Sequence, residues 1–344
     1  MKRCVRCVLP ETFPGIQFDD DGLCQYCRRM PSPEVRMGQR EKLKRRFEAL
    51  VEEVRTDPGH HCLLSWSGGK DSTYVLWLLR HKYDLNVIAF TFDNGFVSTG
   101  AMDNMRTVAE GLGVDHVIIK PNWTMLRTLF AASVDPTIYS PKALERSSAV
   151  CTTCMGLAKG IGLRLALEKR VPMMVYGWSP GQIPLASAFM RGHKAMLKAM
   201  TEAAKAPLVK AGGERAGVYF PEPYHFEAMA RMPVNVSPLL FLDWDEDDAV
   251  ETIGAYGWRR PDDTDPNSTN CLLNCFANEV HIRQLGYHPY AMELAGLVRE
   301  GYMDRDEALR RLTEASPKEM VANVASRLGV PLASVASSDT LVSS

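Results

Sequence analysis

Short apolar runs alternate with amphipathic stretches through the middle of the chain. Runs such as "HCLLSW", "NVIAFTF" and "MMVYG" are typical of buried strands, and the stretches between them have apolar residues at helical spacing. Parallel strands covered on both faces produce this pattern, because crossover helices connect them. We therefore expect an α/β fold with strands at 61–66, 86–92, 116–120 and 173–177, and helices at about 72–82, 101–112 and 155–170.

The regions on either side of this pattern differ from it. An amphipathic helix is predicted at 36–56, with an apolar stripe formed by Leu43, Phe47, Leu50, Val51 and Val54. Beyond residue 180 helices and loops dominate. We expect a cysteine-bearing module at 1–35, a linker helix at 36–57, a main domain at 58–260 with a basic insert near 190–218, a helical region at 261–333 and a flexible tail at 334–344.

The composition is that of a soluble globular protein. The chain has 344 residues, enough for one large domain or two ordinary ones; 46% are hydrophobic, 24% are charged, and the net charge is −1. No apolar run approaches the roughly 18 residues of a membrane span. The N-terminus "MKRCVRCVLP" lacks the long apolar core of a signal peptide. We expect a cytoplasmic protein without membrane contact.

Two stretches are basic although the whole chain is nearly neutral. Residues 28–46 carry eight Lys and Arg against two Glu, and residues 191–215 carry six against two. Such runs are usually solvated helix faces, but they also suit a polyanion such as tRNA or a small anionic molecule such as a nucleotide sugar. His193 and Lys194 are candidates for that contact.

Four of the nine cysteines form a pattern typical of a structural zinc site. Cys4 and Cys7 are followed, after 16 residues, by Cys24 and Cys27. Each C-x-x-C turn directs two thiolates to one ion, and two turns complete a tetrahedron without an open position. A module this short also has too little core to fold without such a staple. We expect Zn²⁺ here; four unligated thiols are the alternative.

The stretch "SWSGGKDS" at 65–72 joins an expected strand to an expected helix. It resembles a phosphate loop but not a Walker A loop, which would need glycine at Leu64 and a hydroxyl residue at Asp71. Backbone N–H groups and the helix dipole favour an anion at this place, and Gly68 and Gly69 allow close approach. An acid there either works with Mg²⁺ or orients a donor of the loop. An ordinary strand–turn–helix corner is the alternative.

The residues Ser67 to Ser72 match the S-G-G-x-D-S motif of the PP-loop family, the N-type ATP pyrophosphatases. The chain resembles that family from about 58 to 180, including "TFDNG" at 91–95 and "VYGWS" at 175–179. The resemblance implies a doubly wound parallel sheet. It also implies that Lys70 and Asp71 take part in catalysis, and that the nucleotide is bound by Ser65, Ser67, Gly68, Gly69, Lys70, Asp71, Ser72, Phe92, Asp93 and Gly177.

The chemistry implied by this resemblance begins with ATP and Mg²⁺. A carbonyl or amide oxygen of the acceptor attacks the α-phosphate, pyrophosphate leaves, and a nucleophile then displaces AMP. The loop would therefore hold the β- and γ-phosphates as a leaving group, which accounts for its difference from Walker A.

Two further cysteine pairs raise the question of the nucleophile. Cys151 and Cys154 open a predicted helix, and Cys271 and Cys275 lie one helical turn apart. This placement resembles the tRNA thiolation branch of the family, in which three cysteines hold a 4Fe–4S cluster that leaves one iron open for sulfide. Carried over, Cys151, Cys154 and Cys271 would be ligands and Cys275 a fourth candidate. A second zinc site and unligated thiols are the alternatives.

The N-terminal stretch "CVRCVLPETFPGIQFDDDGLCQYC" is similar to that of a different branch, the N-acetyl sugar amidotransferases, which use ammonia from a glutaminase. We therefore expect a sulfur transferase or, alternatively, an amidotransferase; a nucleotide-binding protein without enzymatic activity is the third hypothesis. The expected partners are ATP, an unidentified acceptor, a sulfur donor or a glutaminase, and a second copy of the chain as a homodimer.

Overall fold

The computed structural model describes residues 1–264 and 268–331. The tail predicted at 334–344 lies outside the described residues. Six strands form one sheet in the order β3 (Asp115–Ile119), β2 (Val87–Phe92), β1 (Cys62–Ser65), β4 (Met173–Tyr176), β6 (Val234–Val236) and β5 (Phe189–Arg191). All neighbours are parallel except β5, which runs antiparallel to β6 at the edge. The four predicted strands are confirmed to within two residues.

Helices cover both faces of the sheet, as expected for a doubly wound fold. Successive strand residues point to opposite faces, so Leu64 belongs to one core and Leu63 to the other. The first core is closed by α2 (Pro33–Val54), α3 (Lys70–Trp77), α4 (Thr99–Leu112) and α9 (Glu246–Gly254). The second is closed by α5 (Trp123–Ala132), α6 (Ala149–Glu168), α7 (Lys194–Gly212), α10 (Leu273–Leu285) and α13 (Lys318–Leu328).

The strand order creates a switch point between β1 and β4. From β1 the chain proceeds to β2 and β3 on one side, and then returns to place β4 on the other side of β1. Open α/β sheets bind ligands in the crevice beyond the carboxyl ends of the strands at such a point. The loops after Ser65 and Tyr176 therefore flank the expected site.

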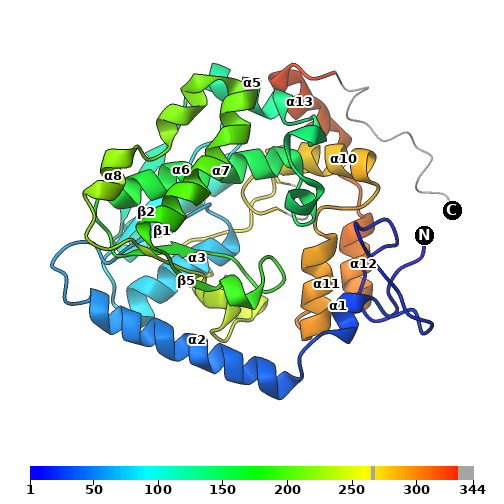
Figure 1. Ribbon diagram of the computed structural model, residues 1–344, viewed down its shortest axis with the longest axis horizontal. Helices are drawn as coiled ribbons and strands as arrows, with labels where there is room; N and C mark the ends of the chain where they lie inside the picture. Colours follow the sequence, from blue (N-terminus) through cyan, green and yellow to red (C-terminus); the bar gives the residue numbers. More distant parts are fainter. Residues whose placement is uncertain (265–267, 332–344) are drawn as a thin grey trace.

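The N-terminal module packs against the C-terminal helices rather than against the sheet. Figure 1 shows it, in blue with α1 (Gln25–Arg28), beside α11 (Ala291–Glu300) and α12 (Arg305–Thr313) in orange. The four cysteines share an apolar core with side chains such as Tyr287 and Leu294. Arg305 donates to the carbonyls of Cys4 and Cys7, both at 3.3 Å. The module and the C-terminal helices thus form one unit.

The helix predicted at 155–170 begins earlier than expected. Ser148 Oγ accepts from the backbone N–H of Cys151 (3.1 Å) and caps α6, so the helix starts at Ala149. Cys151 and Cys154 consequently lie within its first two turns. By length and composition α6 could cross a membrane, but here it lies in the second core, which explains its apolar character.

The basic insert forms α7, and several of its cations have internal partners. Lys194 and Lys198 each lie 2.9 Å from a carboxylate oxygen of Glu227. His193 caps the helix, with Nδ1 accepting from the backbone N–H of Met196 (3.3 Å). These contacts favour the interpretation of this stretch as a solvated helix face.

Candidate active site

Two glycines shape the loop between β1 and α3. Gly68 has φ +77°, in the left-handed region that favours glycine, and Gly69 is the N-cap of α3. Ser72 turns back into the loop, where its Oγ lies 3.1 Å from Ser67 Oγ and accepts from the Ser67 backbone N–H at 3.2 Å. The loop is thus folded tightly over the N-terminus of a helix, a place that favours an anion.

Acidic side chains surround the ammonium group of Lys70. Its Nζ lies 2.9 Å from Asp71 Oδ1, 3.6 Å from Glu246 Oε2 and 5.3 Å from the ring centre of Trp244. Burial opposes the charge of Lys70, but Asp71 and Glu246 outweigh it and raise its pKa. Lys70 is therefore held as a cation beside the loop. Of the two roles expected for Asp71, this contact favours orientation of a loop donor.

A segment about 200 residues away in sequence packs over the loop Ser67–Ser72, which we name the phosphate loop after the motif that it resembles. Trp258 Nε1 donates to the Gly68 carbonyl (3.0 Å), and Asn270 Nδ2 donates to the Ser67 carbonyl (3.0 Å). Thr269 Oγ1 accepts from the first backbone N–H of α3 (3.3 Å). These three contacts fix the loop from outside, and no local pattern in the sequence indicates them.

The remaining residues expected to bind nucleotide occupy three different positions. Gly177 follows β4 and touches the phosphate loop, since a Cβ there would lie 2.5 Å from the Cα of Ser72. Ser65 ends β1 and Phe92 ends β2, and both are half-buried. Asp93 holds a turn instead of standing free: one oxygen accepts from the Gly95 N–H (2.8 Å) and the other lies 2.9 Å from Lys120 Nζ.

Asn94 links two cysteines that are far apart in the sequence. Its Nδ2 lies 3.4 Å from Cys154 Sγ and 3.5 Å from Cys271 Sγ, while its Oδ1 accepts from the Phe96 backbone N–H (2.8 Å). Burial and the neighbouring Cys271 raise the pKa of the Cys154 thiol. Asn94 is 4% exposed, so it is fixed in place as a donor to sulfur. The motif "TFDNG" contains Asn94, but no pattern in the sequence indicates its contacts with the two cysteines.

The other two internal cysteines have different surroundings. Cys151 is half-buried on the first turn of α6 and interacts electrostatically with Cys154. Cys275 is fully buried in the second core, where its Sγ donates to the Leu272 carbonyl (3.1 Å). Cys151, Cys154 and Cys271 thus approach one another, and Cys275 lies in the apolar interior.

The four N-terminal thiols form a compact group that fits one metal ion. Cys4 and Cys27 have their Sγ atoms 3.7 Å apart, and Cys7 and Cys24 likewise. All four Sγ atoms lie within 4.8 Å of one another. Ligands at the Zn–S distance of about 2.3 Å in a tetrahedron are about 3.8 Å apart. The group therefore fits a closed, structural zinc site.

The internal cysteines are spaced more widely than this group. Among residues 1–264 and 268–331, only the N-terminal group brings three or more potential ligand atoms within 4.8 Å of one another. Cys151, Cys154 and Cys271 therefore do not meet the spacing of the N-terminal group, and the metal group that they hold stays a prediction.

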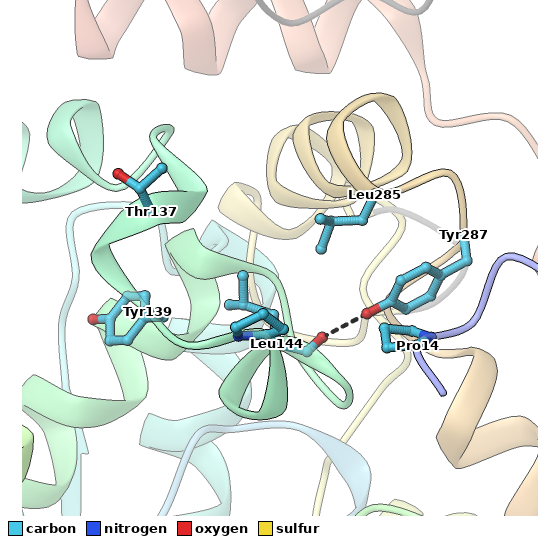
Figure 2. Close-up of a pocket in the computed structure, with 7 residues that line it drawn as sticks. Pro14, Thr137, Tyr139, Leu144, Leu285 and Tyr287 are labelled. Atoms are coloured by element: carbon cyan, nitrogen blue, oxygen red, sulfur yellow. Dashed lines mark hydrogen bonds between the residues drawn. The ribbon is translucent and has the colours of Figure 1, made fainter. Parts of the chain in front are cut away.

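Two cavities lie outside the phosphate loop. One of about 430 Å³ is lined by Gly95, Lys120, Trp123 and Arg327. The other, of about 350 Å³ and almost wholly apolar, is shown in Figure 2; its lining includes Pro14, Leu144, Leu285 and Tyr287. Tyr287 donates its hydroxyl to the Leu144 carbonyl (3.1 Å) beside it, which ties the segment leading to α6 to the end of α10.

The comparisons with known proteins found no matching family model. An uncharacterized protein of Methanocaldococcus jannaschii is 24% identical over 321 residues, which cover 92% of this chain and 96% of that protein. Among solved structures, the U34-tRNA thiolase NcsA of Methanococcus maripaludis with its 4Fe–4S cluster has a TM-score of 0.34 and 16% identity, over 92% of this chain and 91% of that one. NMN synthetase of Francisella tularensis has a TM-score of 0.35 and 12% identity, over 84% of this chain and all of that one.

Proposed function

We propose that this protein is an ATP pyrophosphatase of the PP-loop family that adenylates a carbonyl or amide oxygen and releases pyrophosphate. The observation that carries the proposal is the position of the S-G-G-x-D-S loop. It follows β1 at the switch point of the sheet, and Gly177 of the neighbouring strand's loop touches it. The adjoining helix N-terminus favours the charge that develops on departing pyrophosphate.

The side chains of the loop would act on the phosphates. Lys70 supplies positive charge to the leaving pyrophosphate, and Asp71 orients Lys70 through their contact of 2.9 Å. Ser67 and Ser72 offer hydroxyl donors, and their mutual contact holds them in the loop. Mg²⁺ would accompany the triphosphate and offset its charge.

We further propose sulfide as the nucleophile that displaces AMP. Asn270 donates to the Ser67 carbonyl of the loop, and Cys271 is the next residue, so the backbone at Cys271 directly follows a contact with the proposed ATP site. Cys154 shares the amide of Asn94 with Cys271. With Cys151 these would hold a 4Fe–4S cluster, which, when bound by three thiolates, has an open iron that can carry sulfide.

Amide or amidine formation with ammonia is the second candidate. It is favoured by the N-terminal module, whose sequence is similar to that of N-acetyl sugar amidotransferases and whose four thiols converge. In that case a glutaminase would supply ammonia and a nucleotide sugar would be the acceptor. For sulfur transfer the corresponding partners would be a sulfur donor and tRNA. For either reaction we propose that the enzyme is cytoplasmic and that it forms a homodimer.

The test is a screen for pyrophosphate release with cluster-reconstituted protein. Mg·ATP is combined with bulk tRNA or with nucleotide sugars, and with sulfide or ammonia. We expect release with one acceptor class, and at least about a hundredfold loss in Asp71→Asn. Asp103→Asn, which removes an exposed carboxylate from α4, is the matched control and should keep full activity. Full activity of Asp71→Asn would contradict the proposal, and a preparation active without iron would decide for ammonia.

A further inference from the structure

The C-terminal helix α11 is in backbone contact with the loop that follows β4. Gly181 has φ +87°, and a Cβ on it would collide with the carbonyl oxygen of Glu293. A Cβ on Gly296, one turn further along α11, would lie 2.8 Å from the Cα of Gly181. Two glycines thus allow the loop and the helix to approach more closely than side chains would permit.

The same loop also touches the phosphate loop, four residues earlier. Gly177 lies against the backbone of Ser72 in the first turn of α3. The segment from Gly177 to Gly181 therefore has α3 at one end and α11 at the other. As a result, Glu293 lies near the phosphate loop, although 221 positions separate it from Ser72 in the sequence.

The carboxylate of Glu293 is surrounded by groups of the proposed active site. Gln182 Nε2 donates to its Oε1 (3.3 Å), and Gln182 is itself fixed by accepting from the Ser179 backbone N–H (3.0 Å). The charged groups that act on it are Lys70 and Asp71 of α3, and Arg146, which precedes α6 and donates to the Gly181 carbonyl (3.0 Å).

Unlike Asp71 and Glu246, Glu293 is not engaged by a cation. In the described part of the chain no Lys, Arg or His nitrogen lies within 4.0 Å of its carboxylate, and Oε2 has no hydrogen-bond partner. The side chain is half-buried and Oε2 is not sealed from solvent. One oxygen is therefore held by Gln182 while the other is available to a reacting group.

The pKa of Glu293 lies in the range that proton transfer at neutral pH requires. Burial is the main cause that raises the pKa of Glu293 to about 7, and the charge of Asp71 adds to it. Lys70 and Arg146 act in the opposite direction without cancelling the shift. A carboxylate with these surroundings can accept a proton at neutral pH and release it again.

We propose that Glu293 is the base that removes the proton from the attacking nucleophile when AMP is displaced. This inference rests on the proposed function. Sulfide, as HS⁻, or ammonia forms a bond to the adenylated carbon, and the bond from that carbon to the oxygen of AMP breaks. The hydrogen on nitrogen passes to Glu293 Oε2 and then to solvent. The hydrogen on sulfur passes to Glu293 Oε2 and then, for an amide acceptor, to the nitrogen beside the reacting carbon, which lost its proton on adenylation. One proton is transferred with either nucleophile, so the role holds for both candidate reactions.

The zinc module supports this helix from its other side. Arg299 of α11 lies with Nη1 3.6 Å from Cys7 Sγ, and its guanidinium is 5.8 Å from the ring centre of Tyr26. Cys7 and Tyr26 of the module thus contact the C-terminal half of α11 through Arg299, while Glu293 lies in the N-terminal half of this helix. The module that would hold the structural metal therefore contacts the same helix that carries Glu293.

The experiment compares the full-length protein with Glu293→Gln and a matched control, Glu300→Gln. Glu300 lies at the other end of α11 and pairs with Arg40 at 2.6 Å. AMP formation and single-turnover pyrophosphate release are measured from pH 5.5 to 9 with Mg·ATP, bulk tRNA or a nucleotide sugar, and sulfide or ammonia. The dissociation constant of Mg·ATP is measured over the same range, because it needs no acceptor.

We expect Glu293→Gln to lower the rate of AMP formation at pH 8 by about a hundredfold. The inflection near neutral pH in the pH profile of AMP formation should disappear. The rate of pyrophosphate release should change by less than about threefold. The ratio of wild-type to Glu293→Gln dissociation constants should rise about tenfold between pH 5.5 and 8.5, because the ionised carboxylate repels ATP. Wild-type pH profiles of both quantities in Glu293→Gln would overturn the inference. Failure of the wild-type protein itself to bind ATP would instead contradict the proposed function.

Discussion

Gly177 and Ser72 are in backbone contact across the switch point of the sheet. A Cβ on Gly177 would lie 2.5 Å from the Cα and 2.7 Å from the backbone nitrogen of Ser72. No flexible side chain separates the two, so the loop after β4 sets the position of the first turn of α3. The geometry of the phosphate loop therefore requires that position 177, in the loop after β4, has no side chain.

Gly177→Ala should displace the phosphate loop. Because the colliding atoms are backbone, the structure has to shift, and overpacking of this kind typically costs about 1–3 kcal/mol of unfolding free energy. Mg·ATP affinity should fall at least about tenfold, since the N–H groups of the loop move with the helix. Denaturant unfolding and calorimetric titration with Mg·ATP measure the two effects.

Gly156→Ala is the matched control for that substitution. Gly156 lies inside α6, where a Cβ would be 3.5 Å from the side chain of Leu208, an ordinary contact. Alanine in a helix interior is favoured over glycine by roughly 0.5–1 kcal/mol, so this variant should be at least as stable as the wild type. Equal ATP affinity in both variants would contradict the role given to Gly177.

Asn94→Asp should weaken the retention of iron. The substitution keeps the oxygen that accepts from the Phe96 N–H (2.8 Å) but replaces the amide donor to Cys154 and Cys271 with an acidic oxygen. Loss of a second-layer contact of this kind typically costs 10- to 100-fold in metal affinity. Iron and acid-labile sulfide per chain, measured after anaerobic reconstitution and a chelator challenge, should therefore fall.

Asn86→Asp provides the control, because Asn86 donates to the Gly59 carbonyl (3.3 Å) on an exposed loop away from the sulfurs. Iron retention should match that of the wild type. If Asn94→Asp also retained iron fully, the amide would have no part in holding the cysteines for a metal group.

The sheet was predictable because its central strands are almost continuously apolar. β5 and β6 were missed because each is a strand of three residues, and β6 is closely flanked by Pro233 and Pro238. The position of the loop Ser67–Ser72 between a strand and a helix was predictable from six consecutive residues, and its binding of phosphate stays a prediction. Thr269 contacts this loop and Glu293 interacts electrostatically with Lys70 and Asp71, each from about 200 positions away, and no local pattern indicates such interactions. Tertiary packing alone brings them there.

Removal of the N-terminal metal should destabilise the C-terminal helices together with the module. The four cysteines share a core with Tyr287 and Met292, so the loss of tetrahedral ligation would loosen both parts. Cys24→Ser should lose zinc and lower the melting temperature by roughly 5 °C or more. Zinc per chain by elemental analysis and thermal unfolding followed by circular dichroism check this expectation.

Cys62→Ala is the control for that variant. Cys62 is fully buried in β1 among apolar side chains, and burial raises the pKa of its thiol. Its replacement should cost about 1 kcal/mol through lost packing while zinc per chain stays unchanged. A Cys24→Ser protein with wild-type zinc content would refute the four-thiolate site.

Glu293 should make the stability of the wild-type protein decrease as pH rises through neutrality. Its pKa is raised from 4.5 to about 7 by burial and by Asp71, so between these values the folded state binds more protons than the unfolded state. The free energy of unfolding then falls with rising pH, by at most about 3 kcal/mol, and by less because the side chain is only half-buried. Below about pH 4.5 the carboxyl is protonated in both the folded and the unfolded state, so the free energy of unfolding no longer changes with pH through this group.

Glu293→Gln lacks this ionisation, so its stability relative to the wild type should increase by roughly 1–3 kcal/mol between pH 5 and pH 8 in denaturant unfolding. A change no larger than that of Glu300→Gln would show that the carboxylate of Glu293 is solvated in the folded protein.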